Sequence, residues 1–521
     1  MKVVQPLQQH LCALRFHIEA INRNISDENG LETTMKVGEM LVLDEIPDEF
    51  AERYGASAIP KHMYIRKCYV ELYDLVTAEM IKQQTTKPAM LFTGVPGIGK
   101  SMFMIYFLYR YQTDSRFTDK RFALEFGHGR YHYFEATATS TSKDGVATSS
   151  FMCSISVTRK EFPLNEVLVF ADIGERRQPE TRAKWTLIFS SPDPERFKDF
   201  MKGKPGYMFL LPTWSEDELL YANEHRNEWY GRFVVCGGVP RVVLWDGIGY
   251  DPMNTLNQTL LDKGPRVADY FYKHGFGDID AYKSYSMIHI NPPFSPEKGR
   301  LLYECDTGLI VRTFASNYVC QELTRMHSKG IITSLVELFN AGGGLASERL
   351  GGVSAGHLFE KICSWIVPLA NQNITIDRFP PLSSLAMNIS VPPWEILDSN
   401  WKDLKNHRIG VLYQPQISNL ESGDAFGVIQ NGTELILIVL QYTIDDNHPV
   451  KVNGLKNIVE SYPQEIKDHM NRKLLIFVTP VDGKLQKVQP LHSQGGRVMT
   501  KLPSEVKDFE QWVCRYFIEM T

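Results

Sequence analysis

The chain of 521 residues carries a formal net charge of −5, with 43% apolar and 22% charged residues. That length predicts about three domains, and the composition is typical of a globular protein rather than a disordered one. A weakly acidic chain can bind nucleic acid only through a local basic patch. Eight scattered cysteines without a CxxC pair argue against a zinc ribbon and against a disulfide scaffold. We therefore expect reduced, mostly buried thiols.

The N-terminal residues lack the unbroken apolar core of a secretory signal peptide. No stretch of the sequence approaches the roughly 18 apolar residues of a membrane-spanning helix. We therefore expect a soluble, intracellular protein with no membrane partner. Residues 1–60 give weak signals and are assigned to an N-terminal region of unknown role.

Residues 61–214 alternate strand-like and helical segments, which predicts a parallel α/β sheet. Residues 63–81 carry apolar side chains at helical spacing. Residues 137–150 are rich in Ser and Thr and are predicted to form a loop or a hairpin. The remaining predicted elements are a helix over 101–111 and strands over 87–93, 131–136, 167–171, 186–190 and 207–211.

A glycine-rich segment, Gly-Val-Pro-Gly-Ile-Gly-Lys-Ser, lies between the predicted strand 87–93 and the predicted helix 101–111. It fits the phosphate-binding pattern GxxxxGK[ST] in the required strand–loop–helix context. The backbone N–H groups of such a loop point at phosphates, and the helix N-terminus adds positive potential. Lys100 should contact the β- and γ-phosphates, and Ser101 should ligate Mg²⁺, so ATP and Mg²⁺ are the predicted cofactors. The predicted nucleotide-binding residues are Gly94, Val95, Pro96, Gly97, Ile98, Gly99, Lys100, Ser101, Met102 and Arg241.

Further polar residues complete the predicted nucleotide site. An apolar strand delivers Asp172 to the metal, usually through water. Glu175, three residues on, could polarise the attacking water, and Ser190 at the next strand end could sense the γ-phosphate, as in AAA-type ATPases. Residues 237–241 resemble the lid segment of AAA- and STAND-type ATPases, from which Arg241 would reach the phosphates. The alternative for Asp172 is an ordinary carboxylate at the end of a strand. The alternative for Arg241 is a surface arginine beside a Gly-Pro turn.

Residues 215–345 are predicted to be mostly helical, as a helical lid or winged-helix-like region. The Gly-rich tract 342–352 is predicted to be a linker. The third module, residues 346–521, opens with a predicted helix over 355–367. Its other predicted elements are a hairpin with strands 424–430 and 434–443, turning at Asn431-Gly432, and a strand over 473–479.

This hairpin has the layout of a restriction-endonuclease-like nuclease. Asp424 begins one strand, and Gln441 and Thr443 share one face of the next because strand side chains repeat every two residues. In such nucleases, carboxylates hold Mg²⁺ against the scissile phosphate and a lysine orients the nucleophile, in an acidic residue followed by (D/E)xK. Here Gln-x-Thr stands in place of (D/E)xK, and Glu360 could supply a second carboxylate. From spacing alone, an antiparallel hairpin with a polar face is the alternative.

Together these segments resemble the Crinkler (CRN) and retrotransposon-hot-spot (RHS) family, over roughly residues 60–480. The segments that carry the resemblance are GVPGIGKSMFMIYFLYR, VLVFAD, TLIFSSPDPERF, LPTWSEDEL, CGGVPR and LQYTIDDNHPVKVNGL. The resemblance implies a P-loop ATPase with a helical lid, joined to a restriction-endonuclease-like domain. It also implies a nuclear location and, for some members, secretion, entry into host cells and cell death. Two features depart from the family: no Leu-Phe-Leu-Ala-Lys translocation motif occurs near the N-terminus, and the nuclease motif lacks its lysine.

The expected fold class is α/β: a P-loop (AAA/STAND-like) parallel sheet with a helical lid, and a C-terminal α/β restriction-endonuclease-like domain of degenerate PD-(D/E)xK type. The leading hypothesis is an ATPase that controls a nuclease-like domain acting on DNA. Its predicted catalytic residues are Lys100, Asp172, Glu175, Ser190, Asp424, Gln441 and Thr443, and its predicted metal ligands are Ser101, Asp172, Glu360, Asp424 and Gln441.

One alternative is an ATP-dependent switch that binds nucleic acid or protein through a catalytically inactive nuclease fold. The missing lysine motivates this alternative. Another alternative is a scaffold that does not hydrolyse nucleotide. Host or nuclear proteins are further candidate partners, and the sequence leaves an oligomer open.

Overall fold

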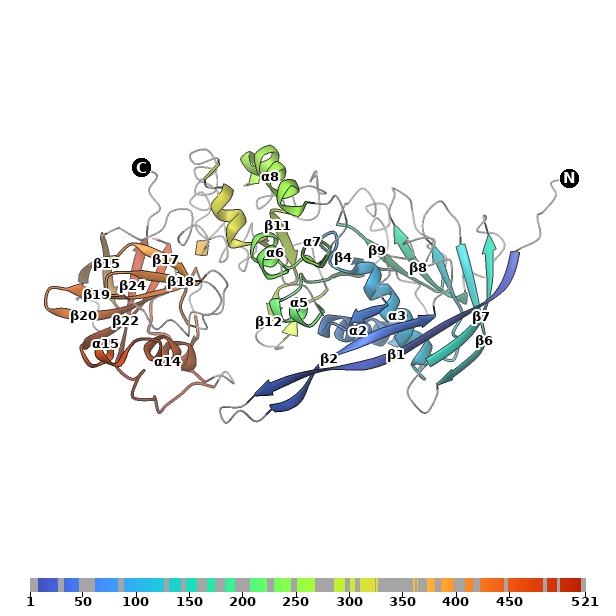
Figure 1. Cartoon of the computed structure of the whole chain (residues 1–521), viewed down its shortest axis with the longest axis horizontal. Coiled ribbons are helices and arrows are strands. Elements are labelled where there is room, and N and C mark those ends of the chain that lie inside the picture. The colour runs from blue at the N-terminus through green and yellow to red at the C-terminus, as the bar shows by residue number, and fades with distance from the viewer. Residues whose placement is uncertain are drawn as a thin grey trace. The chain divides into compact units, whose positions relative to one another are not determined.

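The protein separates into two compact units, Met1–Leu256 with Lys273–Arg312 and Asn257–Tyr272 with Thr313–Thr521 (Figure 1). Each unit has a main sheet that contains parallel strands and is accompanied by helices, so the expected α/β class is confirmed at that level. The computed structural model describes residues 8–26, 32–45, 61–82, 89–125, 131–141, 147–156, 166–173, 183–192, 207–222, 229–244, 251–267, 285–295, 300–304, 310–323, 325–326, 359–360, 363, 373–379, 386–397, 408–415, 422–444, 448–480, 485–493 and 497–516.

The sheet of the first unit has the strand order β10-β4-β9-β8-β5-β6-β7-β1-β2-β3. Its strands are β1 (Gln8–Ser26), β2 (Glu32–Glu45), β3 (His62–Tyr64), β4 (Ala89–Thr93), β5 (Phe122–Glu125), β6 (Tyr131–Thr141), β7 (Ala147–Ser156), β8 (Leu168–Ile173), β9 (Trp185–Ser190) and β10 (Tyr207–Leu210). The run from β10 to β5 is parallel, and the later strands pair antiparallel. All five strands predicted in this region are confirmed within a few residues.

Two predictions for this region need correction or completion. The predicted helix over 63–81 begins later, as α2 (Lys67–Lys82), because Met63 pairs with Leu41 in an edge strand of the sheet. Residues 137–141 and 147–150 lie in β6 and β7, which pair antiparallel and extend the sheet. The N-terminal region, which gave no clear sequence signal, supplies β1 and β2, the long blue ribbon in Figure 1.

The helix α3 (Lys100–Thr113) follows β4 and is buried on almost all sides. Phe103 and Phe107 are fully buried in the main core of this unit. Phe92 on β4 stacks on Phe189 with ring centroids 5.0 Å apart. A helix that is apolar around its whole circumference must be enclosed by other elements. The strongly apolar sequence of this helix therefore sets its position within the core.

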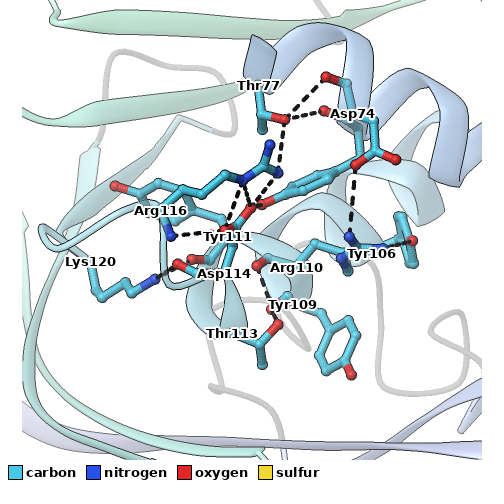
Figure 2. Close-up of polar contacts among 11 residues, drawn as sticks. Asp74, Thr77, Tyr106, Tyr109, Arg110, Tyr111, Thr113, Asp114, Arg116 and Lys120 are labelled. Atoms are coloured by element: carbon cyan, nitrogen blue, oxygen red, sulfur yellow. Dashed lines mark hydrogen bonds and ion pairs between the residues drawn. The ribbon is translucent and has the colours of Figure 1, made fainter. Parts of the chain in front are cut away.

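A polar cluster anchors the C-terminal end of α3, away from its glycine-rich start (Figure 2). Tyr73 Oη on α2 donates a hydrogen bond to Asp114 Oδ2 at 2.9 Å. Arg116 donates to the same carboxylate and, at 3.2 Å, to Thr77 Oγ1. The hydrogen bond from Arg116 lowers the pKa of Asp114 to about 2. Lys120 Nζ donates to two backbone carbonyls at this end, 2.7 and 2.6 Å away. The cluster fixes α3 against α2.

The described residues within 215–345 are mostly helical, as predicted, and short strands interrupt the helices. Its described helices are α5 (Glu216–Ala222), α6 (Trp229–Cys236), α7 (Pro240–Val243), α8 (Pro252–Lys263) and the 3-10 helix η2 (Gly264–Arg266), and residues 317–323 and 325–326 are helical as well. It also contains the short strands β11 (Ile288–Asn291), β12 (Phe294–Ser295), β13 (Arg300–Leu301) and β14 (Val311–Phe314). Strand β11 pairs with β14, and β12 pairs with β13. These paired strands are the part of the region that local helical preference did not predict.

The second unit has an eight-stranded sheet of order β16-β15-β24-β22-β20-β19-β18-β17. Its strands are β15 (Asn373–Arg378), β16 (Ala386–Ser390), β17 (Trp394–Leu397), β18 (Leu412–Pro415), β19 (Ala425–Asn431), β20 (Glu434–Tyr442), β22 (Met470–Pro480) and β24 (Phe509–Tyr516). Strands β20, β22 and β24 are parallel. Between β20 and β22 lie β21 (Val450–Lys451), which pairs with β23 (Leu491–His492), and the helices α14 (Val452–Glu460) and α15 (Gln464–Asp468). Apolar residues of α14 pack in one core with β19, β20 and β22.

The predicted hairpin and the predicted strand 473–479 are confirmed as β19, β20 and β22. The turn lies one residue later than the Asn-Gly pattern predicted, because Asn431 pairs with Glu434 and Gly432-Thr433 connect the strands. Gly432 takes the positive φ of 63° that the first position of such a turn demands. Of the predicted helix 355–367, the structure describes residues 359–360 and 363, which are helical. The predicted linker 342–352 and Glu175 lie outside the described residues.

The five cysteines with described side chains are reduced and buried, as expected: Cys68, Cys236, Cys320, Cys363 and Cys514. In the described part of the chain, no helix is both long and apolar enough to cross a membrane.

Candidate functional site

The glycine-rich loop connects β4 to α3 and touches the segment that contains Arg241. Gly97 takes a φ of 88°, and a Cβ atom added there would lie 2.8 Å from Arg241 Cβ. Arg241 N donates a hydrogen bond to Gly97 O at 3.4 Å. Residue 97 therefore needs a glycine both for its backbone conformation and for the close approach of α7. The structure brings Arg241 to the loop, where the lid resemblance placed it.

The lysine and serine of the loop make defined contacts. Lys100 Nζ donates hydrogen bonds to Gly94 O at 2.9 Å and Val95 O at 3.1 Å. Ser101 Oγ donates to Asp172 Oδ2 at 2.9 Å, although the two residues are 71 positions apart. The two residues predicted from separate motifs to hold Mg²⁺ are thus in direct contact.

The hydroxyl of Ser101, in the first turn of α3, and the carboxylate of Asp172, near the end of β8, together suit Mg²⁺. This ion prefers oxygen ligands and is commonly held by one or two carboxylates together with substrate phosphates and water. Ser101 and Asp172 supply a hydroxyl oxygen and a charged oxygen at one point. The residues present therefore fit a Mg²⁺ ion that accompanies a nucleotide.

Two buried hydroxyls lie along the same edge of the sheet. Strand β9 lies between β4 and β8, and its last residue, Ser190, pairs with Ile173 just after Asp172. Thr93 ends the neighbouring strand β4. Both hydroxyls are buried and have no hydrogen-bond partner within the described residues. Buried polar atoms are nearly always satisfied, and parallel α/β sheets bind ligands beyond the carboxyl ends of their strands. This edge is therefore the candidate site for phosphate.

Two aromatic residues that sequence reasoning missed hold the loop from outside. Tyr69 Oη on α2 donates to Gly99 O at 3.0 Å. Trp214 Nε1 donates to Ile98 O at 2.8 Å. These two hydrogen bonds fix the carbonyls of Ile98 and Gly99. Trp214 lies within LPTWSEDEL, one of the segments that carry the family resemblance, so a signal for it existed.

Trp214 is itself supported by a buried arginine. Arg66 is 1% exposed and forms a two-pronged ion pair with Glu218, with both distances 2.9 Å. It also donates to Pro212 O and Thr213 O, and its guanidinium lies 4.9 Å from the centroid of the Trp214 ring. Burial acts to lower the pKa of Arg66, but the negative charge of Glu218 helps to hold it above its usual value. Arg66 therefore stays charged.

The second unit brings Asp424 and Gln441 together at the start of β19 and the end of β20. Gln441 Nε2 donates to Asp424 Oδ2 at 2.8 Å, and Tyr442 N donates to the same oxygen at 2.6 Å. Gln441 is 9% exposed and Thr443 3% exposed, and Thr443 N donates to Val478 O. An amide can bond a carboxylate directly, whereas a glutamate at position 441 would repel it. Gln441 therefore bonds Asp424 directly, where a glutamate at that position would repel it.

Glu360 lies in the same region as Asp424. Burial first, and then the charges of Cys514, Asp424 and Glu360, hold the pKa of the Cys363 thiol well above its usual value. Both carboxylates thus lie within electrostatic range of one thiol. Among the residues that the structure describes, no three His, Cys, Asp or Glu side chains gather in a way that could hold a metal ion. The geometry brings Asp424 and Gln441 together, and the role of Glu360 as a further ligand stays a prediction.

Two curated proteins are similar to part of this chain, and no protein-family model matches it. Crinkler effector protein 15 of Phytophthora infestans is 27% identical over 244 residues, and Crinkler effector protein 16 of the same organism is 28% identical over 242 residues. Each alignment covers 42% of this chain and 35% of the relative, so the chain spans about a third of the length of the curated relatives it matches. The chain is Crinkler-like over that part. The sequence-based resemblance is confirmed to this extent.

Proposed function

We propose that the first unit binds and hydrolyses ATP with Mg²⁺ at the loop 94–101. The contact between Ser101 Oγ and Asp172 Oδ2, at 2.9 Å, carries the proposal because it joins two motifs that were identified independently. Backbone N–H groups of the loop and of the first turn of α3 would bind the phosphates. A bound Mg²⁺ ion would neutralise charge on the phosphates. Ser101 and Asp172 would hold that ion.

Lys100 is the cation that would reach the phosphates. Its ammonium now donates to the carbonyls of Gly94 and Val95, at the start of the loop. A phosphate oxygen is a better acceptor for an ammonium than a neutral carbonyl, because both partners are then charged. Lys100 would therefore turn toward the nucleotide when it binds. Ser190 and Thr93, with their buried hydroxyls, would donate to phosphate oxygens or to the attacking water.

Rates of ATP hydrolysis test this proposal. Wild type should release phosphate in a Mg²⁺-dependent manner, and Lys100→Met and Asp172→Asn should each lower the rate by on the order of a hundredfold or more. Lys120→Met is the matched control, because Lys120 Nζ also donates to two backbone carbonyls but lies at the far end of α3. Equal rates for wild type and Lys100→Met would contradict the proposal.

We further propose that the second unit is a nuclease-like domain that binds DNA under control of the ATPase. The order of the helical residues 359–360 and 363, the β19–β20 hairpin, α14 and strand β22 supports this, as does the contact between Asp424 and Gln441. Thr443 is buried where the nuclease pattern has lysine, so no cation stands at that position. This observation favours binding over cleavage. Cleavage remains the second candidate, and it rests on the oxygens of Asp424 and Gln441.

One preparation can separate the two candidates. Binding predicts a DNA affinity that falls as salt rises, with plasmid left intact in the presence of Mg²⁺ and ATP. Cleavage predicts nicked or linear plasmid from wild type and intact plasmid from Asp424→Ala. If wild type shows no salt-dependent DNA affinity and no cleavage, the nucleic-acid role is contradicted.

The similarity to two proteins named Crinkler effectors supports a role in a host cell, with the nucleus as the proposed location. A fluorescent fusion produced in host cells should collect in the nucleus, and wild type should lower cell viability. Lys100→Met should accumulate equally but lose the effect on viability. An exclusively cytoplasmic signal would contradict the location, and equal viability loss for both proteins would contradict control by the ATPase.

A further inference from the structure

The segment after β10 runs along the glycine-rich loop, and nearly all its polar backbone groups are bonded. Leu211 N donates to Thr93 O at 2.9 Å, at the point where β4 enters the loop. Arg66 donates to the carbonyls of Pro212 and Thr213. Thr213 also donates through its backbone N–H and its hydroxyl to Asn291 Oδ1, at 2.8 and 3.0 Å. A segment held at so many points is a fixed support rather than a loose connection.

Trp214 is the residue of this support that meets two other parts of the site. Its indole Nε1 donates to Ile98 O in the phosphate-binding loop at 2.8 Å. Its backbone N–H donates to Gly238 O at 2.8 Å, in the segment that leads into α7. That segment returns to the loop through the hydrogen bond from Arg241 N to Gly97 O. Trp214, the loop and residues 237–241 thus form a closed circuit of three contacts.

The circuit continues into helix α5. Ser215 and Glu218 cap α5 reciprocally, since Ser215 N donates to Glu218 Oε2 at 3.0 Å and Glu218 N donates to Ser215 Oγ at 3.2 Å. The same Glu218 carboxylate pairs with Arg66, whose guanidinium stacks on the Trp214 ring. The position of the indole is therefore set by the ion pair and by the start of α5 together.

We propose that Trp214 is a positioning residue that couples the phosphate-binding loop to the Gly237–Val243 segment, so that nucleotide binding at the loop changes the order of that segment. The inference rests on the proposed nucleotide site. A phosphate bound by the loop would pull on the peptide groups around Ile98 and Gly97, and both peptide carbonyls belong to the circuit. Residues 237–243 would then become more protected when nucleotide is bound.

Trp214→Phe tests this coupling, because it keeps an aromatic ring for Arg66 and removes the indole N–H. Trp229→Phe on α6 is the matched control for the loss of an indole. Hydrogen–deuterium exchange of the nucleotide-free proteins should show faster exchange at residues 94–101 and 237–243 in Trp214→Phe, and no change at 94–101 in Trp229→Phe. Loss of one hydrogen bond that orients the loop should also weaken binding of a fluorescent ADP analogue with Mg²⁺ by about tenfold.

The decisive comparison is the protection that the ADP analogue induces at residues 237–243. Wild type and Trp229→Phe should show this protection. Trp214→Phe should not show it even at saturating analogue, whereas a merely structural role for the indole would leave the protection intact. Induced protection in Trp214→Phe equal to that in wild type would overturn the proposal. If wild type does not bind the analogue, the proposed nucleotide function fails. Exchange in the nucleotide-free proteins still tests whether Trp214 holds the loop and residues 237–243 together. Exchange in Trp214→Phe equal to wild type at both segments would overturn that coupling.

Discussion

Replacing Arg66 by methionine would remove a guanidinium that is 1% exposed, while keeping most of the side-chain volume. The Glu218 carboxylate, 18% exposed, would lose its counter-ion, and the carbonyls of Pro212 and Thr213 would lose their donors. Removing one partner of a buried ion pair destabilises proteins by about 3–5 kcal/mol. The two carbonyls add to this cost without being strictly additive, because they share one donor group. We expect a loss of at least about 3 kcal/mol.

Labelling of the Cys68 thiol measures this loss locally. Cys68 lies two residues from Arg66 and is buried, and burial raises its pKa to about 12, so the folded thiol is unreactive. Labelling then requires local opening of α2. A loss of about 3 kcal/mol in the free energy of opening makes labelling of the variant roughly a hundredfold faster than labelling of wild type. Both rates are first divided by the rate in the unfolded chain. Cys514 in the second unit should label at an unchanged rate and serves as the internal control.

Two further variants separate charge from packing. Arg66→Met combined with Glu218→Gln should recover part of the loss, because no uncompensated carboxylate remains. Lys82→Met on the same helix removes an exposed partner of Glu79. It should change the free energy of opening, measured by Cys68 labelling, by less than about 1 kcal/mol. Cys68 labelling in Arg66→Met within threefold of the wild-type rate would refute the reasoning.

Three other outcomes follow from single side chains. Burial lowers the pKa of His289 to about 4, so the unfolded chain binds a proton below about pH 6.5 while the folded chain does not; wild type should lose up to about 3 kcal/mol between pH 6.5 and 4, and His289→Leu should lose less in urea titrations at the two pH values. The hydrogen bond from Arg116 lowers the pKa of Asp114 to about 2, so its contribution is present above about pH 3.8 and is lost as pH falls toward 2; Asp114→Asn should show a smaller drop in Tm over that range. Gly97→Ala should weaken binding of Mg·ATP by about tenfold or more in calorimetry, because a Cβ atom there would lie 2.8 Å from Arg241 Cβ, while the circular dichroism spectrum stays unchanged; unchanged affinity would contradict the close approach.

The parts of the nucleotide site that could be predicted are those with a local signal. The spacing of Gly94, Gly99, Lys100 and Ser101 between an apolar strand and an apolar helix predicted the loop, and the structure places it between β4 and α3. Asp172 was found because an unbroken apolar run ends at it. Such signals depend on a few consecutive residues, so each can be recognised in the sequence alone.

The support of the loop could not be predicted in this way. Arg66 and Glu218 are 152 residues apart, and nothing in the residues around Arg66 indicates a buried ion pair. The strand order, which puts Ser190 next to the strand of Asp172, is likewise a property of tertiary pairing. The helix that was predicted to start at residue 63 starts at Lys67, because pairing of Met63 with β2 decides that boundary. Long-range contacts therefore set what local patterns leave open.

The account depends most directly on the phosphate-binding loop, and calorimetric titration with Mg·ATP tests it. Wild type should bind one equivalent, and Lys100→Met should bind at least tenfold more weakly, because the ammonium is the one side-chain cation that the loop sequence 94–101 contains. Ser101→Ala should weaken binding when Mg²⁺ is present and have little effect when it is removed by a chelator. Equal affinities for wild type and Lys100→Met, or no binding by wild type, would contradict the central claim.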